Sequence, residues 1–237
     1  MMGKEGIILV GIDHADEHLQ EVLKVIEEHK GKVKTIGIEG IFVEDAKILN
    51  EYANRIGNQP EAENICRIVF KIKGTPPFWA DAAIHAIKNG MQIVPIDSRY
   101  ADKKFKSLLL SNSEKFEKLD QIAENYFKNE ISFRQAMKEF LKIKIVRGVV
   151  NMNFTSLPIR DKFMIRRILK QKPDMVIVGA GHGIGISKVV PVRKRISLFT
   201  PSIPAKIYFK SLRIAYNVNR SISAFRKKLK SHVRATK

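Results

Sequence analysis

Two Gly-x-x-His motifs contain the residues of this chain best suited to chemistry. They read Gly11-Ile12-Asp13-His14 and Gly179-Ala180-Gly181-His182, and each follows a short apolar run. Such runs are typical of strands that are covered on both faces of a sheet. A glycine before each histidine lets the backbone turn sharply or approach a ligand closely. Both imidazoles are therefore expected just beyond the carboxyl end of a strand.

Two carboxylates are expected at the same edge. Glu39 and Asp97 each end a predicted strand, and sites in α/β sheets lie beyond the carboxyl ends of strands. His14, His182 and Glu39 could together hold a divalent metal and leave positions open for water. The same groups could instead act as general base and acid without any metal.

Each of these residues also has a purely structural interpretation. A histidine after a strand can simply belong to a loop or a cap, and Glu39 could cap the following helix or pair with a lysine. Asp97 and Arg99 could form a turn with an exposed ion pair, which contributes little to stability. Arg160 and Asp161 stand in the first turn of a predicted helix and could pair locally.

Strand and helix patterns alternate along the chain and set the expected fold. Predicted strands span Ile7–Ile12, Val33–Glu39, Met91–Ile96 and Met175–Val178, and amphipathic helical patterns lie between them. Pro158 opens the last of these helices and Pro173 closes it. We expect an α/β domain over residues 1–190 with a central mixed sheet flanked by helices. Helical stripes at about residues 105–150 indicate a helical insertion in that domain.

The composition argues against a membrane-spanning protein and against a secreted protein held by disulfides. No segment approaches the roughly 20 apolar residues of a membrane span, and no signal peptide is visible. The single cysteine, Cys66, excludes an internal disulfide and suits a reducing cytoplasm; its apolar surroundings favour a core position. The glycines from Gly179 to Gly185 do not form a dinucleotide-binding loop, because Ile184 stands where the third glycine is required.

The basic charge is concentrated at the C-terminal end. The chain carries a net charge of +19, yet residues 191–237 hold 13 Lys and Arg and no acid. Apolar residues from Ile207 to Leu229 recur at nearly helical spacing among these bases. This pattern favours a basic helical extension on an anionic membrane, at the inner face of the membrane of a cytoplasmic protein. Nucleic acid fits less well because aromatic residues for base stacking are few. Packing on the protein's own body or in a homodimer is the structural alternative.

The motifs occur in the order found in the TraB family, whose wider group includes the Tiki proteases and the erythromycin esterase-like proteins. Residues 8–14 resemble the family's first Gly-x-x-His strand, and residues 35–39 resemble its strand ending in an acid. Residues 81–97 resemble the helix and strand that end in aspartate, and residues 160–164 resemble the Arg-Asp segment. Residues 176–186 resemble the closing block, which is the most specific. Two positions depart from the family pattern: Gly40 follows Glu39, and Ser98 separates Asp97 from Arg99.

The resemblance implies hydrolysis at a His/Glu site. Tiki members are metal-dependent proteases that use Mn or Co, and the esterase-like members hydrolyse an ester with His and Glu. Bacterial TraB members are linked to the shutdown of peptide pheromones. By this resemblance His14, Glu39 and His182 bind the metal, which is Mn or Co, or alternatively Zn or Fe. Arg160 steadies a carboxylate, and Asp97, Arg99, Asp161, Gly11 and Gly179 support the site.

Two functions follow from the sequence. The first is a metal-dependent hydrolase acting on a peptide or another small hydrolysable substrate. The second is a non-enzymatic regulator that keeps the site for ligand binding and associates with a membrane surface or a partner through residues 191–237.

Overall fold

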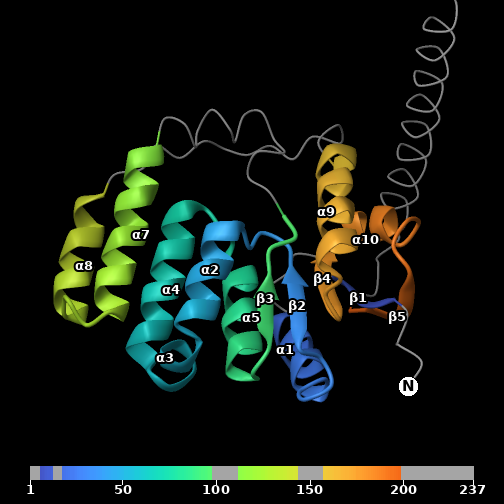
Figure 1. The fold of residues 1–237 in the computed structure, drawn as a ribbon, viewed down its shortest axis with the longest axis horizontal. Coiled ribbons are helices and arrows are strands. Elements are labelled where there is room, and N and C mark those ends of the chain that lie inside the picture. Colours follow the sequence, from blue (N-terminus) through green and yellow to red (C-terminus); the bar gives the residue numbers. More distant parts are fainter. Residues whose placement is uncertain (1–5, 13–17, 98–111, 144–156, 199–237) are drawn as a thin grey trace, which may run out of the picture.

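Five parallel strands form the centre of the computed structural model, which describes residues 6–12, 18–97, 112–143 and 157–198 (Figure 1). They are β1 Ile7–Ile12, β2 Thr35–Ile38, β3 Gln92–Val94, β4 Met175–Gly179 and β5 Val192–Ser197, in the spatial order β3-β2-β4-β1-β5. The predicted α/β class is confirmed. In the described part of the chain every strand pair is parallel, so the sheet is not mixed. The reason is that each connection runs through helices and returns the chain to the edge it started from.

Helices fill every described connection between strands. They are α1 Leu19–Glu28, α2 Val43–Glu51, α3 Ala53–Asn58, α4 Pro60–Lys73, α5 Pro77–Lys88, α7 Ser113–Phe127, α8 Phe133–Lys142, α9 Leu157–Gln171 and α10 Ala180–Ile186. Their ends follow local rules: α4 and α5 begin with proline in the first turn, and α4 ends at Gly74 with φ of 85°. Helices α2 to α4 fill residues 43–73, for which no particular helix is predicted from the sequence.

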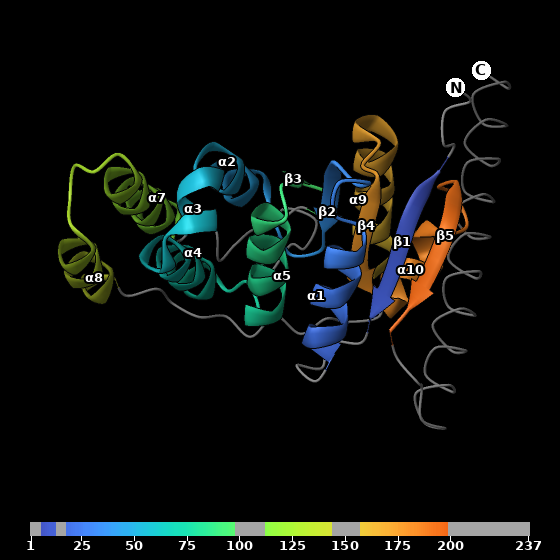
Figure 2. The same ribbon diagram turned by 90° about the horizontal axis from the view of Figure 1, so that it is seen from below.

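The two faces of the sheet are covered by different helices. Ile8, Val10 and Ile12 of β1 belong to the larger core, which contains α1 and α5, whereas Ile7 and Leu9 belong to a smaller core with α9 and α10. Figure 2 shows these helix pairs on opposite sides of the strands. Because crossovers between parallel strands are right-handed, connections that run toward β3 and toward β5 must use opposite faces.

The helical insertion predicted at about residues 105–150 contains α7 and α8; its remaining parts fall within residues 98–111 and 144–156, which lie outside the described residues. A buried lysine ties this insertion to the sheet domain. Lys73 at the end of α4 is 2% exposed and lies 3.3 Å from Asp45 of α2, and it also pairs with Asp120 of α7. A buried ammonium is tolerated only with such partners, so Lys73 fixes how α2, α4 and α7 meet.

The sheet extends beyond the predicted domain boundary at residue 190. Val192–Ser197 is not the start of a separate extension but forms the edge strand β5, which pairs with β1. The remaining predicted extension, residues 199–237, lies outside the described residues. Among the helices that the structure describes, none has the length and apolar content that crossing a bilayer requires.

Candidate active site

The carboxyl ends of β2, β4 and β1 lie side by side and form the floor of the candidate site. Ile12 of β1 pairs with Gly179 of β4, and Ile38 of β2 pairs with Ile177 of β4. Strands β1 and β4, whose last residues belong to the two Gly-x-x-His motifs, are therefore neighbours. His14 itself lies outside the described residues.

Glu39 follows β2 and is only 1% exposed. Its Oε2 accepts a 2.7 Å hydrogen bond from the backbone N–H of Gly179, and its Oε1 accepts a 3.1 Å hydrogen bond from Nη2 of Arg160. The φ of Gly179 is −55°, which any residue adopts. The site therefore uses the amide of this residue rather than the conformational freedom of glycine.

Arg160 of α9 joins two buried carboxylates. Its Nη2 donates to Glu39 and also to Oδ2 of Asp97, at 2.5 Å, and the same Asp97 oxygen accepts the N–H of Gly40 at 3.1 Å. Burial acts to lower the pKa of Arg160, but Asp97 and Glu39 outweigh it and raise that pKa above its ordinary value. Arg160 thus stays charged beside Glu39 and Asp97.

His182 and Asp161 form a second buried pair beside Glu39. Nδ1 of His182 lies 2.6 Å from Oδ1 of Asp161, and both side chains are 2% exposed. Burial lowers the pKa of His182, but the charge of Glu39 and the hydrogen bond to Asp161 outweigh it and raise that pKa to about 9. Burial raises the pKa of Asp161, and the contact with His182 offsets only part of that rise.

The other nitrogen of His182 faces Glu39. Nε2 lies 3.3 Å from Oε1 of Glu39 and makes no hydrogen bond with the described residues. Buried polar atoms normally have a hydrogen-bond partner. One imidazole nitrogen is thus held by a carboxylate while the other points toward a second carboxylate.

A short glycine-rich helix carries His182. Helix α10 begins directly after β4 and contacts α9, β1 and β4. Its first turn brings His182 back over the sheet toward Asp161, which lies in the first turns of α9. One part of the site therefore comes from α9, β4 and α10, which are consecutive in the chain. The other part comes from the residues that follow β2 and β3.

Sequence reasoning missed the support given by Gly40 and Trp79. Gly40 has φ of 75°, a conformation that favours glycine, and a Cβ atom added there would lie 3.1 Å from Cδ1 of Trp79. The indole of Trp79, 2% exposed, thus packs on the backbone that supplies an N–H to Asp97. The glycine after Glu39, noted as a departure from the TraB pattern, was the available signal.

The remaining predicted residues fall into three groups. Arg99 lies outside the described residues, as does His14. Gly11 lies on β1 opposite Val178 and only 3.9 Å, measured from an added Cβ, from Cα of Ala180. Cys66 is 1% exposed, and burial raises its thiol pKa, so it belongs to the core as predicted.

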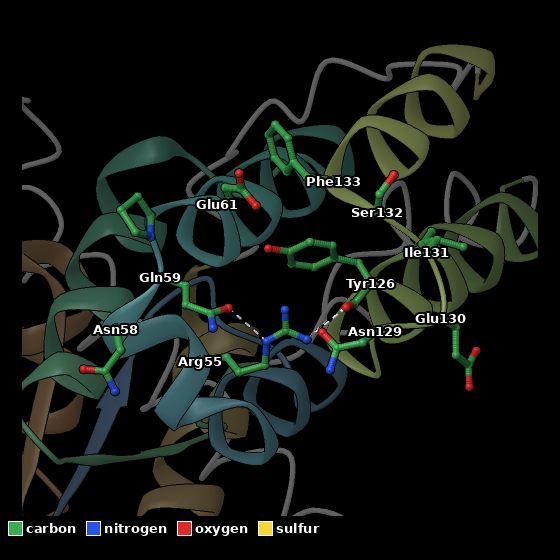
Figure 3. Close-up of a pocket in the computed structure, with 11 residues that line it drawn as sticks. Arg55, Asn58, Gln59, Glu61, Tyr126, Asn129, Glu130, Ile131, Ser132 and Phe133 are labelled. Carbon is green, nitrogen blue, oxygen red and sulfur yellow. Dashed lines mark hydrogen bonds between the residues drawn. The ribbon is translucent and has the colours of Figure 1, made fainter.

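A cavity of about 830 Å³ lies elsewhere, between α3 and α4 on one side and α7 and α8 on the other (Figure 3). Arg55 projects into it, but the guanidinium is already bound. It donates to Oε1 of Gln59 and to the backbone carbonyls of Tyr126 and Phe127 at the end of α7. This arginine caps a helix, and no lining residue belongs to the cluster around Glu39.

Among the described residues, no group of three or more His, Cys, Asp or Glu side chains is arranged to hold a metal ion. Of the predicted ligands His14, Glu39 and His182, the described residues therefore include Glu39 and His182. The chain matches no protein-family model, no curated protein and no solved structure.

Proposed function

We propose that the protein is a metal-dependent hydrolase whose site is formed by Glu39, His182 and His14, with a peptide or another small ester- or amide-containing molecule as substrate. The observation that carries the proposal is the pair of contacts made by His182. Asp161 holds Nδ1 at 2.6 Å, and Nε2 lies 3.3 Å from Oε1 of Glu39.

These contacts fit a metal ligand. A histidine that binds a metal through one nitrogen usually donates its other N–H to a carboxylate or a carbonyl. Two ligand atoms about 2.1 Å from one ion, at a tetrahedral angle, are about 3.4 Å apart, close to the 3.3 Å separation found here. His182 and Glu39 would hold the ion, with His14 as the third ligand.

The charge of the cluster also favours a cation. The carboxylates of Glu39, Asp97 and Asp161 are each at most 2% exposed. Within the described residues, Arg160 is a cation that binds two of them, Glu39 and Asp97. With a protonated His182, which its raised pKa favours in the metal-free protein, these groups sum to one negative charge; with the neutral His182 that binds a metal, they sum to two. Because buried charge must be compensated, a divalent ion suits the cluster better than an apolar or anionic ligand does. Mn and Co are the first candidates, and Zn and Fe are the alternatives.

A bound divalent metal supplies Lewis acidity and a nucleophilic water at neutral pH. The chain's own residues prepare for this. The carboxylate of Asp161 accepts a hydrogen bond from Nδ1–H of His182, which keeps the proton on Nδ1 and leaves the lone pair on Nε2. Arg160 and the N–H of Gly179 fix the two oxygens of Glu39. Asp97 in turn fixes Arg160, since it accepts from both that side chain and Gly40.

The test begins with metal content. The purified protein is stripped with a chelator, reloaded with Mn, Co or Zn, and assayed for bound metal and for cleavage of a quenched peptide library and p-nitrophenyl esters. We expect His14→Ala combined with His182→Ala to abolish both, whereas His85→Gln leaves them unchanged, because His85 lies in α5 beside Glu27. Unchanged metal and cleavage in the double variant would exclude the proposal.

Glu39→Gln distinguishes two roles of the carboxylate. If Glu39 is a ligand, the variant loses metal and activity together. If Glu39 is the general base, the variant keeps its metal and loses only cleavage.

A non-enzymatic regulator is the second candidate function, and the concentration of basic residues at the C-terminal end of the chain favours it. In that case the same cluster binds metal or ligand without turnover. Metal binding with no cleavage of any probe by the reloaded protein supports this alternative.

A further inference from the structure

Residues 157–198 are far more basic than the rest of the described chain. They contain ten Lys and Arg against two Asp, whereas residues 18–97 and 112–143 together contain 16 Lys and Arg against 17 Asp and Glu. Both Asp residues are committed elsewhere: Asp161 binds His182, and Asp174 accepts the backbone N–H groups of Lys34 and Thr35. No acid of this segment therefore offsets the bases at the surface.

The exposed bases of this segment lie on the outer side of α9, directly after α9 and on β5. Helix α9 buries Asp161, Met164, Ile165 and Ile168, so the opposite side of the helix faces outward. Six bases of the segment are exposed: Lys162, Arg166, Lys170, Lys172, Lys194 and Arg195. Figures 1 and 2 show α9, α10 and β5 at the same end of the molecule, away from α7 and α8. We call these six residues the basic end.

Apolar side chains are exposed among these bases. Leu169 of α9 is 45% exposed and Val189, just after α10, is 47% exposed. They are two of the four large hydrophobic residues exposed in the described part of the chain. Leu169 is adjacent to Lys170 and three residues from Arg166, so it shares their side of the helix.

We propose that the basic end binds an anionic membrane surface, with α9 lying along the headgroups and Leu169 reaching below them. Clusters of four to eight Lys and Arg are typical of contact with anionic lipids, and aliphatic residues among them add insertion into the interface. Nucleic acid fits less well. Phe163, the aromatic residue of α9, is half-buried and its ring lies 5.3 Å from the guanidinium of Arg167, so it is poorly placed to stack on a base.

This surface acts independently of the metal site, and it is not limited to residues 191–237. The basic residues of 199–237 add to the same charge in sequence. Helix α9 thus serves on two sides. Its inner side carries Arg160 and Asp161, and its outer side carries the membrane contact.

The test uses the full chain and vesicles of phosphatidylcholine with and without phosphatidylserine. We expect binding only to the anionic vesicles, weakening as salt rises. Each Lys or Arg near an anionic leaflet strengthens binding about 5-fold. Lys162→Glu, Arg166→Glu and Lys170→Glu together should therefore weaken binding by about 100-fold or more.

A control with the same change in net charge isolates the surface. Lys118→Glu, Arg134→Glu and Lys138→Glu alter exposed bases of α7 and α8 and should change binding less than about 3-fold, since screening limits their reach to about 10 Å. Circular dichroism verifies the fold of both proteins. Equal weakening in both triple variants, or no binding to anionic vesicles at low salt, overturns the proposal.

Leu169→Ser separates lipid from other polyanions. This substitution leaves the charge unchanged and should weaken vesicle binding several-fold while leaving heparin and duplex DNA binding unaltered. If instead the α9 triple variant loses tight binding to duplex DNA or RNA while Leu169→Ser has no effect on vesicles, the partner is nucleic acid and the membrane proposal is wrong.

Discussion

Nδ1 of His182 lies 2.6 Å from Oδ1 of Asp161, with both side chains shielded from water. Asp161→Asn keeps the size of that side chain but removes its charge. Loss of such a supporting carboxylate typically lowers metal affinity 10- to 100-fold. We therefore expect a weakening of about that size for Mn or Zn, measured by competition with a chromogenic chelator.

Asp174→Asn is the matched control for that experiment. Asp174 also binds groups from a distant part of the chain, the N–H groups of Lys34 and Thr35 and the hydroxyl of Thr35, but it lies at the opposite ends of β2 and β4. It should lower the free energy of unfolding by about 1–3 kcal/mol and leave metal affinity unchanged. Equal metal affinities of Asp161→Asn and the wild type would contradict a supporting role for Asp161.

The stability of the metal-free protein should depend on the protonation of His182. Burial lowers the pKa of this imidazole, yet Glu39 and Asp161 raise it to about 9, whereas an unfolded histidine titrates near pH ~6.5. A raised pKa means that the protonated form favours folding. The gain is complete below about pH 6.5 and is lost as pH rises to about 9.

Denaturant unfolding at pH 6, 7.5 and 9 measures that effect in the wild type and in His182→Gln. The difference in unfolding free energy should shrink steadily with rising pH. Long-range proton–nitrogen NMR follows the imidazole directly, and bound metal should abolish its titration because metal and proton compete for Nε2. A His182 imidazole that titrates at its ordinary value is the result that rejects this prediction.

Arg160→Met should be among the most destabilising single substitutions in the chain. It leaves Glu39 and Asp97, both 1% exposed, without the cation that joins them. Removing one partner of a buried ion pair costs about 3–5 kcal/mol. Arg67→Met also removes an arginine between two carboxylates, Glu63 and Asp81, but that side chain is 43% exposed. It should cost at most about 1 kcal/mol, so similar losses in the two variants would refute the buried-pair interpretation.

The parts of the fold that were predictable from sequence are those whose pattern is local. The apolar runs at Ile7–Ile12 and Met175–Gly179 reveal strands because burial on both faces leaves no polar position. The rule that sites lie at the carboxyl ends of strands then brings Glu39, Asp97 and Gly179 to one edge. Which carboxylate meets Arg160, 121 residues after Glu39, depends on how α9 crosses the sheet and has no local signal.

Helix α10 and strand β5 escaped prediction because tertiary contacts override local preference. Helix α10 contains Gly181, Gly183 and Gly185, which disfavour a helix, and packing against α9 and β1 holds it. Strand β5 contains Arg193, Lys194 and Arg195 and resembles a solvated tail, yet its backbone pairs with β1. An edge strand can be charged in this way because one side remains in water.

Gly40→Ala should cost more than Gly31→Ala although both glycines have nearly the same backbone conformation, with φ of 75° and 73°. The strain of a left-handed alanine, about 1–2 kcal/mol, is common to both. An added Cβ meets no atom within 4 Å at Gly31 but lies 3.1 Å from Trp79 at Gly40. Because overpacking typically adds 1–3 kcal/mol, the difference between the two variants should be at least about 1 kcal/mol.

Trp79 is the single tryptophan of the chain, so its fluorescence reports both unfolding and the local shift. Only Gly40→Ala should change the native emission and weaken metal binding through Asp97; equal stabilities and identical spectra would mean that Trp79 does not support the site.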